Sequence, residues 1–390
     1  MKKTIGALIT AAVVFCACGN KDTSSLPSVL EMQQNTTLSY VDDAKTLGNV
    51  LQTYDTPVQR FQTTSKKPSI VTGNLGTIVH VNPANLETFD GQPLGETIDV
   101  ELKEYCTQMD LLRGNVATVS DGQLLVSGGA YYLNMSSDGN PLRIKQGKSL
   151  EVEFPKFADE EMELFYGQRD SLGQMNWQVA QQQFRARNAA EATRTTETKP
   201  VVVTVEEVLT IVDNFVIVES PYEVDTVDMT GFSQEELEAL KKQKQKENEL
   251  RAKITETEVS MYQAIKINQL GWINVDRFLK MSDRTPLLIA FNEPEKIRFA
   301  NLYLVFKDIN SLMQRFYYPA DYIKITGESG FASFKDLPVG YNVRLIAYGF
   351  SEEGELYVHS SDLTIEKDGK LFIDLQKSSN DDLDKLFASN

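Results

Sequence analysis

The chain has 390 residues, which is long enough for two or three domains with buried cores. Its composition, with 41% hydrophobic and 24% charged residues, is ordinary for a folded protein. Acidic residues outnumber basic ones by 55 to 39, so the surface is a poor match for nucleic-acid phosphates and anionic headgroups. This balance excludes nucleic acid as an expected partner.

The N-terminus carries the features of an export signal. Lys2 and Lys3 form a positively charged start, Ile5 to Ala17 is a short apolar run that ends in small residues, and Cys18 follows. This order is typical of a secretory signal, and the apolar run is too short to span a membrane. The Ala17-Cys18 junction resembles the lipobox of bacterial lipoproteins, in which the cysteine is lipidated and becomes the new N-terminus. We therefore expect residues 1–17 to be a lipoprotein signal peptide and Cys18 to be the lipidation site.

The residues after the cysteine bear on sorting. Lys21 and Asp22 resemble the charged surface-export signals of Bacteroidetes lipoproteins. Residue 19 is Gly, whereas an Asp there resembles an inner-membrane retention signal in many Gram-negative bacteria. The resemblance implies an outer-membrane protein held by acyl chains, with surface-facing and periplasm-facing orientations both open. The alternatives are an uncleaved N-terminal helix, or cleavage elsewhere with Cys18 left as a plain thiol.

The cysteines and charges of the mature chain follow from this cleavage. With Cys18 acylated, Cys106 is the one thiol left of the three cysteines, so no intramolecular disulfide forms. Removal of Lys2 and Lys3 changes the formal net charge from −16 to −18. We therefore expect the lipid, not surface charge, to hold the protein at the membrane, and packing alone to stabilise its fold.

Residues 18–70 are predicted to form a polar tether between the membrane and the folded body. Asn20 to Ser69 is rich in Ser, Thr, Gln and Asn and has few sustained apolar patterns. A short helix is expected near Leu38 to Leu51. The alternative is that this segment packs as part of the first domain.

Residues 71–156 have the pattern of an all-β domain. Thr97 to Leu102 alternates apolar and polar residues, which is typical of a half-buried strand. Asp121-Gly122 and Asp138-Gly139 are favoured in two-residue hairpin turns. Short strands with a turn signal about every eight to twelve residues predict a β-sandwich. Further strands are expected at Thr77–Val81, Ala117–Val119, Leu124–Val126, Ala130–Asn134, Leu142–Ile144 and Ser149–Phe154.

The same segment resembles a known family, the ZU5-like β-modules of Bacteroidetes surface lipoproteins of unknown function. The similar stretches are GTIVHVNPANLETFDGQPLGETIDVELKEY at 76–105, DLLRGNVATVSDGQLLVSGGAYY at 110–132 and PLRI at 141–144. The family shares a G-x-I-x-x-V-x-P start, a D-G-x-P-x-G turn and an L-x-S-G-G-M-type strand, and here Ala130 takes the place of the Met. The resemblance implies a β-sandwich and little about activity. Some ZU5-containing eukaryotic proteins cleave themselves at a His-Phe-Ser-type step, and no such step occurs here.

Residues 157–285 are predicted to be a mixed α/β middle region. Motifs that recur in the same lipoproteins are M-x-L-F-x-G at 162–167, N-W at 176–177 and L-G-W-I-N-x-D-R-F at 270–278. In the last motif, bulky Trp272 and Phe278 favour a packing role, and Asp276 with Arg277 is expected to satisfy backbone groups at a turn. A ligand site is the alternative for this motif.

Helical and β segments alternate between these motifs. Gln178 to Thr193 is polar and helix-prone, and Val201 to Glu219 has β-branched runs that predict two strands. Ser233 can cap a helix in which Glu236 closes a capping box. Sparse apolar positions predict a solvated charged helix over 233–253, and a coiled-coil partner is the alternative.

Residues 286–377 predict a second β-sandwich. The F-x-D-L-P-x-G turn at 334–340 and the strand after it resemble carboxypeptidase-regulatory and transthyretin-like sandwiches. Asp368-Gly369 is expected to form a hairpin turn. Residues 378–390 are predicted to be a C-terminal tail, either a short helix or disordered. Strands are expected at Leu287–Phe291, Ala300–Phe306, Tyr322–Ile325, Ala332–Phe334, Asn342–Gly349, Leu356–Val358, Leu363–Ile365 and Leu371–Leu375.

Residue types that carry chemistry are sparse. His80 and His359 are the two histidines, and each lies inside a strand pattern in a different predicted domain. No short His/Cys spacing provides the three or four ligands of a zinc site, and no phosphate loop or G-x-S-x-G motif occurs. Cys106 has no histidine near it in sequence. Carboxylates are numerous, so an acid pair or a Ca²⁺ site built in three dimensions stays open.

The sequence therefore predicts a mainly β protein of several β-sandwiches with a helical middle segment. We assign it no catalytic, cofactor-binding or metal-binding residue. The expected function is that of a non-enzymatic, lipid-anchored protein of the cell envelope that binds a protein or glycan partner through sandwich loops. The alternatives are a structural component of a gliding or secretion machine, and a carboxylate-dependent hydrolase.

Overall fold

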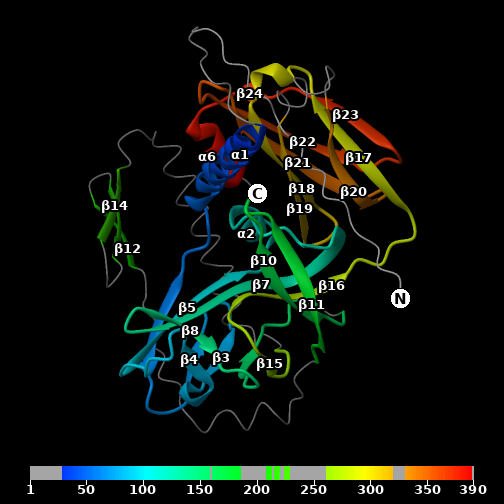
Figure 1. Ribbon diagram of the computed structural model, residues 1–390. Coiled ribbons are helices and arrows are strands. Elements are labelled where there is room, and N and C mark those ends of the chain that lie inside the picture. Colours follow the sequence, from blue (N-terminus) through cyan, green and yellow to red (C-terminus); the bar gives the residue numbers. More distant parts are fainter. Residues whose placement is uncertain are drawn as a thin grey trace, which may run out of the picture.

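The computed structural model describes residues 29–158, 160–185, 208–212, 215–219, 224–228, 261–318 and 330–388. Over these residues the chain is mainly β, as the sequence predicts, and two β-sandwiches are stacked end to end (Figure 1). No described helix has the length and apolar character that a bilayer crossing needs. The predictions that lie outside the described residues are the signal peptide 1–17, Cys18, Lys21, Asp22, the charged helix 233–253 and the strand Tyr322–Ile325.

The first sandwich has a nine-stranded sheet and a four-stranded sheet. The main path of the larger sheet is β1 (Gln59–Thr64), β5 (Thr97–Tyr105), β7 (Gln123–Ser137), β16 (Gly271–Phe278), β10 (Glu163–Arg169) and β11 (Met175–Gln183). Attached to that path are β4 (Leu86–Thr88), β6 (Val119–Ser120) and β8 (Asn140–Ile144). The smaller sheet runs β15 (Ile265–Ile267), β9 (Leu150–Glu153), β3 (Ile78–Val81) and β2 (Ser69–Thr72).

The two sheets share one apolar core because their inward positions alternate with polar ones. Along β5, Ile98, Val100 and Leu102 are buried while the residues between them are partly exposed. They pack with residues of the smaller sheet such as Val79 and Val152. The structure therefore confirms that residues 71–156 are mainly β strands. The alternation of apolar and polar residues along each strand determines which side chains face the core.

Two predicted hairpin turns are confirmed. Asp121 and Gly122 have φ values of 45° and 87° and join β6 to β7. Asp138 and Gly139, at 50° and 76°, join β7 to β8. Positive φ at both central residues is the geometry that matches the strand twist, and Asp and Gly adopt it at low cost.

The prediction that residues 157–285 form a separate region is wrong for four of the strands described there. β10, β11 and β16 belong to the larger sheet of the first sandwich, and β15 belongs to the smaller one. The helix predicted over Gln178 to Thr193 is wrong for Gln178 to Gln183, which belong to β11 and pair with β10, and residues 186–193 lie outside the described residues. These pairings join distant segments, so no local pattern revealed them. Within this region β12 (Val208–Val212), β13 (Phe215–Glu219) and β14 (Val224–Asp228) form a separate antiparallel sheet.

The second sandwich packs a three-stranded sheet on a five-stranded one. The smaller sheet runs β20 (Ala332–Pro338), β17 (Arg284–Phe291) and β23 (Gly369–Ile373), and the larger runs β19 (Ser311–Tyr317), β18 (Phe299–Phe306), β21 (Asn342–Phe350), β22 (Leu356–Thr364) and β24 (Gln376–Lys377). Ile289, Phe334, Leu302 and Leu345 lie in the core between them.

One turn of this sandwich differs from its prediction. Asp368, with a φ of 51°, leads from β22 into β23, but β23 pairs with β17 in parallel. Asp368-Gly369 therefore connects the two sheets and does not form a hairpin. The Asp-Gly pair favours a tight turn with positive φ, but it does not determine which strand the next segment pairs with.

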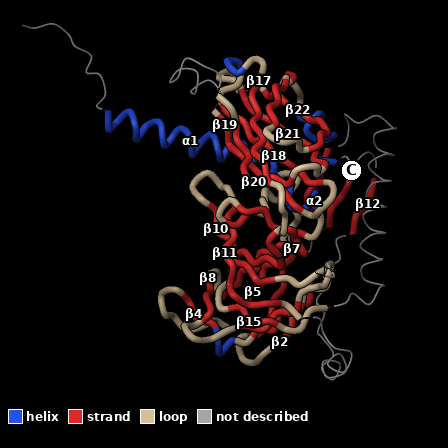
Figure 2. Tube along the Cα trace, turned by 90° about the vertical axis from the view of Figure 1, so that its right-hand side faces the viewer, coloured by secondary structure: helices blue, strands red, loops and turns tan. Residues whose placement is uncertain are grey.

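Both ends of the described chain pack on the outer face of the five-stranded sheet. α1 (Val29–Gln52) buries Leu47 and Leu51 there, and α6 (Asn380–Ala388) buries Leu383 and Phe387 beside them. The Tyr348 hydroxyl of β21 donates to the Leu47 carbonyl oxygen at 3.1 Å. Figure 2 shows the N-terminal part of α1 projecting away from this sandwich.

The predicted tether over 18–70 is wrong from the second half of α1 onward. That half of the helix is part of the core, β1 pairs with β5, and β2 pairs with β3. The physical reason is that a few apolar residues, Leu47 and Leu51 among them, are enough to fix a polar helix to a large apolar face. The alternative, that this segment packs as part of the first domain, is confirmed for β1 and β2, whereas α1 packs on the second sandwich.

Candidate functional site

Two sequence motifs meet on the larger sheet of the first sandwich. The L-x-S-G-G motif lies on β7 and the L-G-W-I-N-x-D-R-F motif lies on β16, and these strands pair in an antiparallel register. Asn274 faces Ala130, Asp276 faces Ser127, and a bulge separates the two pairs. Asn274 and Asp276 are both completely buried.

Asp276 is a buried acid without an ionic partner among the described residues. The Asn274 Nδ2 group donates to Asp276 Oδ2 at 2.6 Å, while Asp276 Oδ1 has no hydrogen-bond partner. Burial raises the pKa of Asp276 well above its usual value, although hydrogen bonds from Ser127, Asn274 and the Gly128 backbone oppose this. Among the described residues, no second carboxyl group contributes to this shift.

The turn between β18 and β19 closes the cluster from the side of the second sandwich. The Ser127 amide donates to the Asn310 carbonyl oxygen at 2.8 Å, and Asn310 Nδ2 donates to the Ser127 carbonyl oxygen at 3.0 Å. The Thr118 amide donates to the Leu312 carbonyl oxygen at 2.8 Å. Through Ser127, the residue that faces Asp276, this polar cluster is hydrogen-bonded to the second sandwich.

The bulky residues of the second motif pack as the sequence predicts. Trp272 lies 5.6 Å from the Tyr105 ring, and the Arg169 guanidinium lies 4.7 Å from the Trp272 ring. Phe278 contacts the Phe165 ring at 5.5 Å. Asp276 and Arg277 lie within β16, not at a turn, so that detail of the prediction is wrong.

The histidines and Cys106 are placed as ordinary residues of the fold. His80 lies on β3 with its Nε2 atom 3.0 Å from Glu153 Oε1, and His359 lies on β22 with its Nδ1 atom 2.9 Å from the Asp374 carbonyl oxygen. Burial raises the pKa of the Cys106 thiol well above its usual value, so the thiol is protonated at neutral pH. Within the described ranges, no group of three or more His, Cys, Asp and Glu side chains is placed to hold a metal ion.

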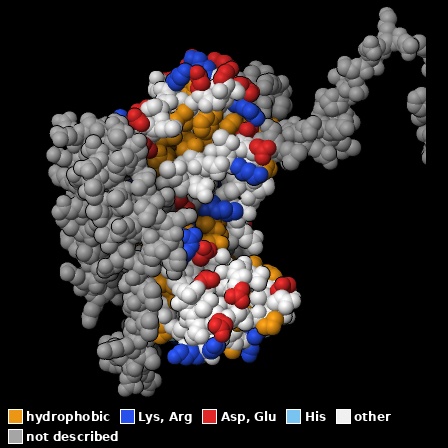
Figure 3. Space-filling model, turned by 90° about the vertical axis from the view of Figure 1, so that its left-hand side faces the viewer, with side chains coloured by type: hydrophobic (Ala, Val, Ile, Leu, Met, Phe, Trp, Pro, Cys, Tyr) orange, Lys and Arg blue, Asp and Glu red, His pale blue; other side chains and the backbone are white. Residues whose placement is uncertain are grey.

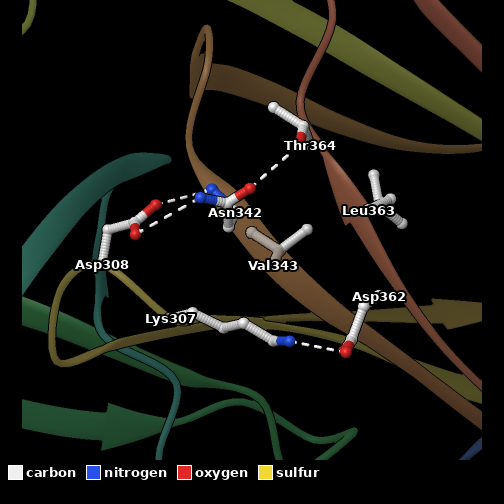
Figure 4. A pocket seen from close by; sticks show the side chains of 7 residues that line it. All are labelled: Lys307, Asp308, Asn342, Val343, Asp362, Leu363 and Thr364. Carbon is white, nitrogen blue, oxygen red and sulfur yellow. Dashed lines mark hydrogen bonds and ion pairs between the residues drawn. The ribbon is translucent and has the colours of Figure 1, made fainter.

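A pocket of about 330 Å³ opens where three strands of the second sandwich end (Figure 4). We call it the strand-end pocket. It is lined by Lys307, Asp308, Asn342, Val343, Asp362, Leu363 and Thr364. Lys307 and Asp308 follow β18, and Asn342 and Val343 begin β21. The remaining three, residues 362–364, are the last residues of β22.

Hydrogen bonds and ion pairs hold the polar groups of the pocket in place. The backbone N–H of Asn342 donates to Asp308 Oδ2 at 2.6 Å, and the Thr364 hydroxyl donates to the side-chain oxygen Oδ1 of Asn342 at 2.9 Å. Asp362 lies between two cations, with Lys307 Nζ at 2.6 Å and Arg344 Nε at 3.0 Å. These two partners, Arg344 foremost, lower the pKa of Asp362 to about 2.

Apolar side chains of the described residues reach the outer surface at several places. Figure 3 shows hydrophobic side chains gathered on the upper sandwich and a smaller group between the sandwiches, with acidic and basic side chains interspersed. Within the part of the chain that the structure describes, the most exposed large apolar residue is Phe89, at 62%, in the loop between β4 and β5. The Arg143 guanidinium lies 5.2 Å from its ring. Single exposed residues of this kind are common in soluble domains and define no patch by themselves.

Sequence reasoning located only part of these sites. It singled out the F-x-D-L-P-x-G turn, which leads into the pocket wall at Asn342, but it assigned no role to Lys307, Asp308 or Asp362. These residues come together only when β18, β21 and β22 pair. The available signal was that Lys307 and Asp308 follow the predicted strand Ala300–Phe306 and that Asn342 begins another.

Comparison with known proteins does not add a family. No family model matches the chain, and no curated protein matches it significantly.

Proposed function

We propose that this chain is a non-enzymatic, lipid-anchored protein of the outer membrane that binds a glycan partner through loops and strand ends of its sandwiches. The observation that carries the proposal is the order of charged start, short apolar run, small residue and Cys18 at the N-terminus. Acyl chains on Cys18 supply membrane affinity that an acidic surface lacks.

The architecture supports a binding role for the body. The two sandwiches share a polar and apolar junction, so they present their loops in a fixed relation. The strand-end pocket is a concave site whose polar side chains are held in place by hydrogen bonds to one another. A hydrolase with paired acids is less well supported, because Asp276, the acid in the described residues whose pKa lies well above its usual value, is completely buried.

The anchor is tested by metabolic labelling of cells with an alkyne fatty acid. We expect the wild-type protein and the matched control Cys106→Ser to take up label, and Cys18→Ser to lose it. Protease treatment of intact cells then separates surface-facing from periplasm-facing protein. Wild-type protein found unlabelled in the cytosol with residues 1–17 intact would overturn the proposal.

A further inference from the structure

We infer that the strand-end pocket binds an uncharged saccharide unit, which is the glycan contact of the function proposed above and rests on that proposal. The inference depends on the size of the pocket, on the balance of its charges and on the order of its polar groups.

The dimensions suit one small ligand rather than a long chain. The volume of about 330 Å³ is at the low end of ligand pockets, which range over roughly 300–1,000 Å³. Leu363 is partly exposed and contributes the apolar part of the lining, while its pairing partner Val343 on β21 is buried in the core beneath it. A sugar ring has a C–H face and a rim of hydroxyl groups, so it can contact Leu363 and the polar side chains of the lining together.

The charges of the pocket favour a neutral ligand. Lys307 and Arg344 are both paired with Asp362, and Asp308 accepts hydrogen bonds from the Asn342 backbone and side chain. An anionic ligand would have to displace Asp362 from its two cations, and a cationic ligand would have to compete with them for the carboxylate. Hydroxyl groups need no such exchange, because each one both donates and accepts a hydrogen bond.

The polar groups are fixed before any ligand arrives. Thr364, Asn342 and Asp308 form a continuous chain of hydrogen bonds from the end of β22 to the turn after β18. Gln108 of α2 (Gln108–Arg113) donates to the Ile309 carbonyl oxygen at 2.6 Å and so holds that turn against the first sandwich. A pre-ordered site loses little side-chain entropy on binding, which matters for a ligand that buries little apolar area.

The test is saturation-transfer NMR on the full mature chain with glucose, galactose, mannose and N-acetylglucosamine, each at about 10 mM, which exceeds a millimolar Kd. We expect transfer to at least one sugar, and shifts of the Val343 and Leu363 methyl signals on titration. Thr364→Val removes a hydroxyl at an exposed position with little change in shape, and Asp308→Asn removes an acceptor charge. Each is expected to weaken binding at least tenfold.

A matched control is Glu355→Gln, which breaks an exposed ion pair with Lys377 elsewhere on β22 and should bind like wild type. Thermal melting of every variant separates loss of binding from loss of folding. The inference fails if no sugar shows transfer, if the pocket variants bind as well as the control, or if sulfate or sialic acid shifts the two methyl signals and the neutral sugars do not. Fatty-acid labelling of Cys18 is unaffected by these outcomes, so the anchor proposal stands or falls separately.

Discussion

At the scale of single residues, Asp276 is the side chain whose state depends most on its surroundings. Its carboxyl group is fully buried, receives a hydrogen bond from Asn274, and has one oxygen without a partner among the described residues. Burial favours the neutral acid because a charge there loses its hydration. The protein therefore binds a proton at Asp276 more tightly when folded than when unfolded.

The first prediction concerns pH. Because the folded pKa is raised, the contribution of Asp276 to stability is complete below the unfolded pKa of about 3.9 and is lost as pH rises toward the folded value. The loss is about 1.4 kcal/mol for each pKa unit between the two. Asp276→Asn should remove this slope and be more stable than wild type at neutral pH. Urea unfolding from pH 4 to 8 measures both curves.

The control for this experiment is Asp362→Asn. The pKa of Asp362 is lowered, so its contribution is present above the unfolded value and is lost as pH falls toward about 2. The variant should therefore leave the slope above pH 4 as it is in wild type. A wild-type curve without any fall between pH 4 and 8 would contradict the assignment of a raised pKa to Asp276.

The second prediction concerns the glycine of the L-x-S-G-G motif. A Cβ atom on Gly128 would lie 2.9 Å from the Val275 carbonyl oxygen, and that backbone cannot move without breaking the register of β16. Gly128→Ala should destabilise the protein by about 1–3 kcal/mol, the usual cost of overpacking. Gly48→Ala in α1 is the matched control, because nothing lies within 4 Å of its Cβ position. It should stabilise the helix by about 0.5–1 kcal/mol, and denaturant unfolding compares the two.

At the scale of elements, strand alternation and turn chemistry were predictable, and strand partners were not. The alternation of Thr97–Leu102 and the Asp-Gly pairs at 121 and 138 specify local geometry, and the structure confirms them. The placement of β16 between β7 and β10 depends on contacts between distant segments, so the sequence suggested a separate region there. The strand-end pocket was missed for the same reason, since its polar residues become neighbours only through pairing.

The third prediction tests α6 as a cover for the five-stranded sheet. Phe387 is fully buried and lies 5.0 Å from the Tyr54 ring and 6.0 Å from the Tyr348 ring. Phe387→Ala should cost about 3–5 kcal/mol, because it leaves a cavity between α6 and the sheet. The exposed Lys385→Ala should change stability by less than about 0.5 kcal/mol. A Phe387→Ala melting curve that overlaps that of Lys385→Ala would show that α6 does not pack there.

At the scale of the whole molecule, the junction makes the two sandwiches one mechanical unit. One apolar cluster collects residues from α1, α2, α6 and both sandwiches, among them Leu47, Leu112, Trp177 and Tyr303. Backbone hydrogen bonds from Thr118 and Ser127 extend the first sandwich onto the β18–β19 turn. We therefore expect the wild-type chain to unfold in a single transition.

The fourth prediction tests this coupling. Asn310→Ala removes the donor to the Ser127 and Cys106 carbonyl oxygens, which lie 3.0 Å and 3.2 Å away. Leaving these acceptors unpaired should cost about 1–3 kcal/mol and separate the calorimetric transitions of the two sandwiches. Asn292→Ala, which removes an exposed contact to Asp374, should keep the single transition. Identical calorimetric traces for the two variants would argue against a coupled junction.

The late place of β16 in the sequence determines when the larger sheet can be completed during synthesis. This strand fills the middle of the larger sheet, yet it is synthesised after β12, β13 and β14. A nascent chain that has emerged only to residue 185 lacks the strand that joins β7 to β10, so its first sandwich has an open seam. Late closure of this kind slows folding and prolongs the exposure of strand edges until β16 is in place.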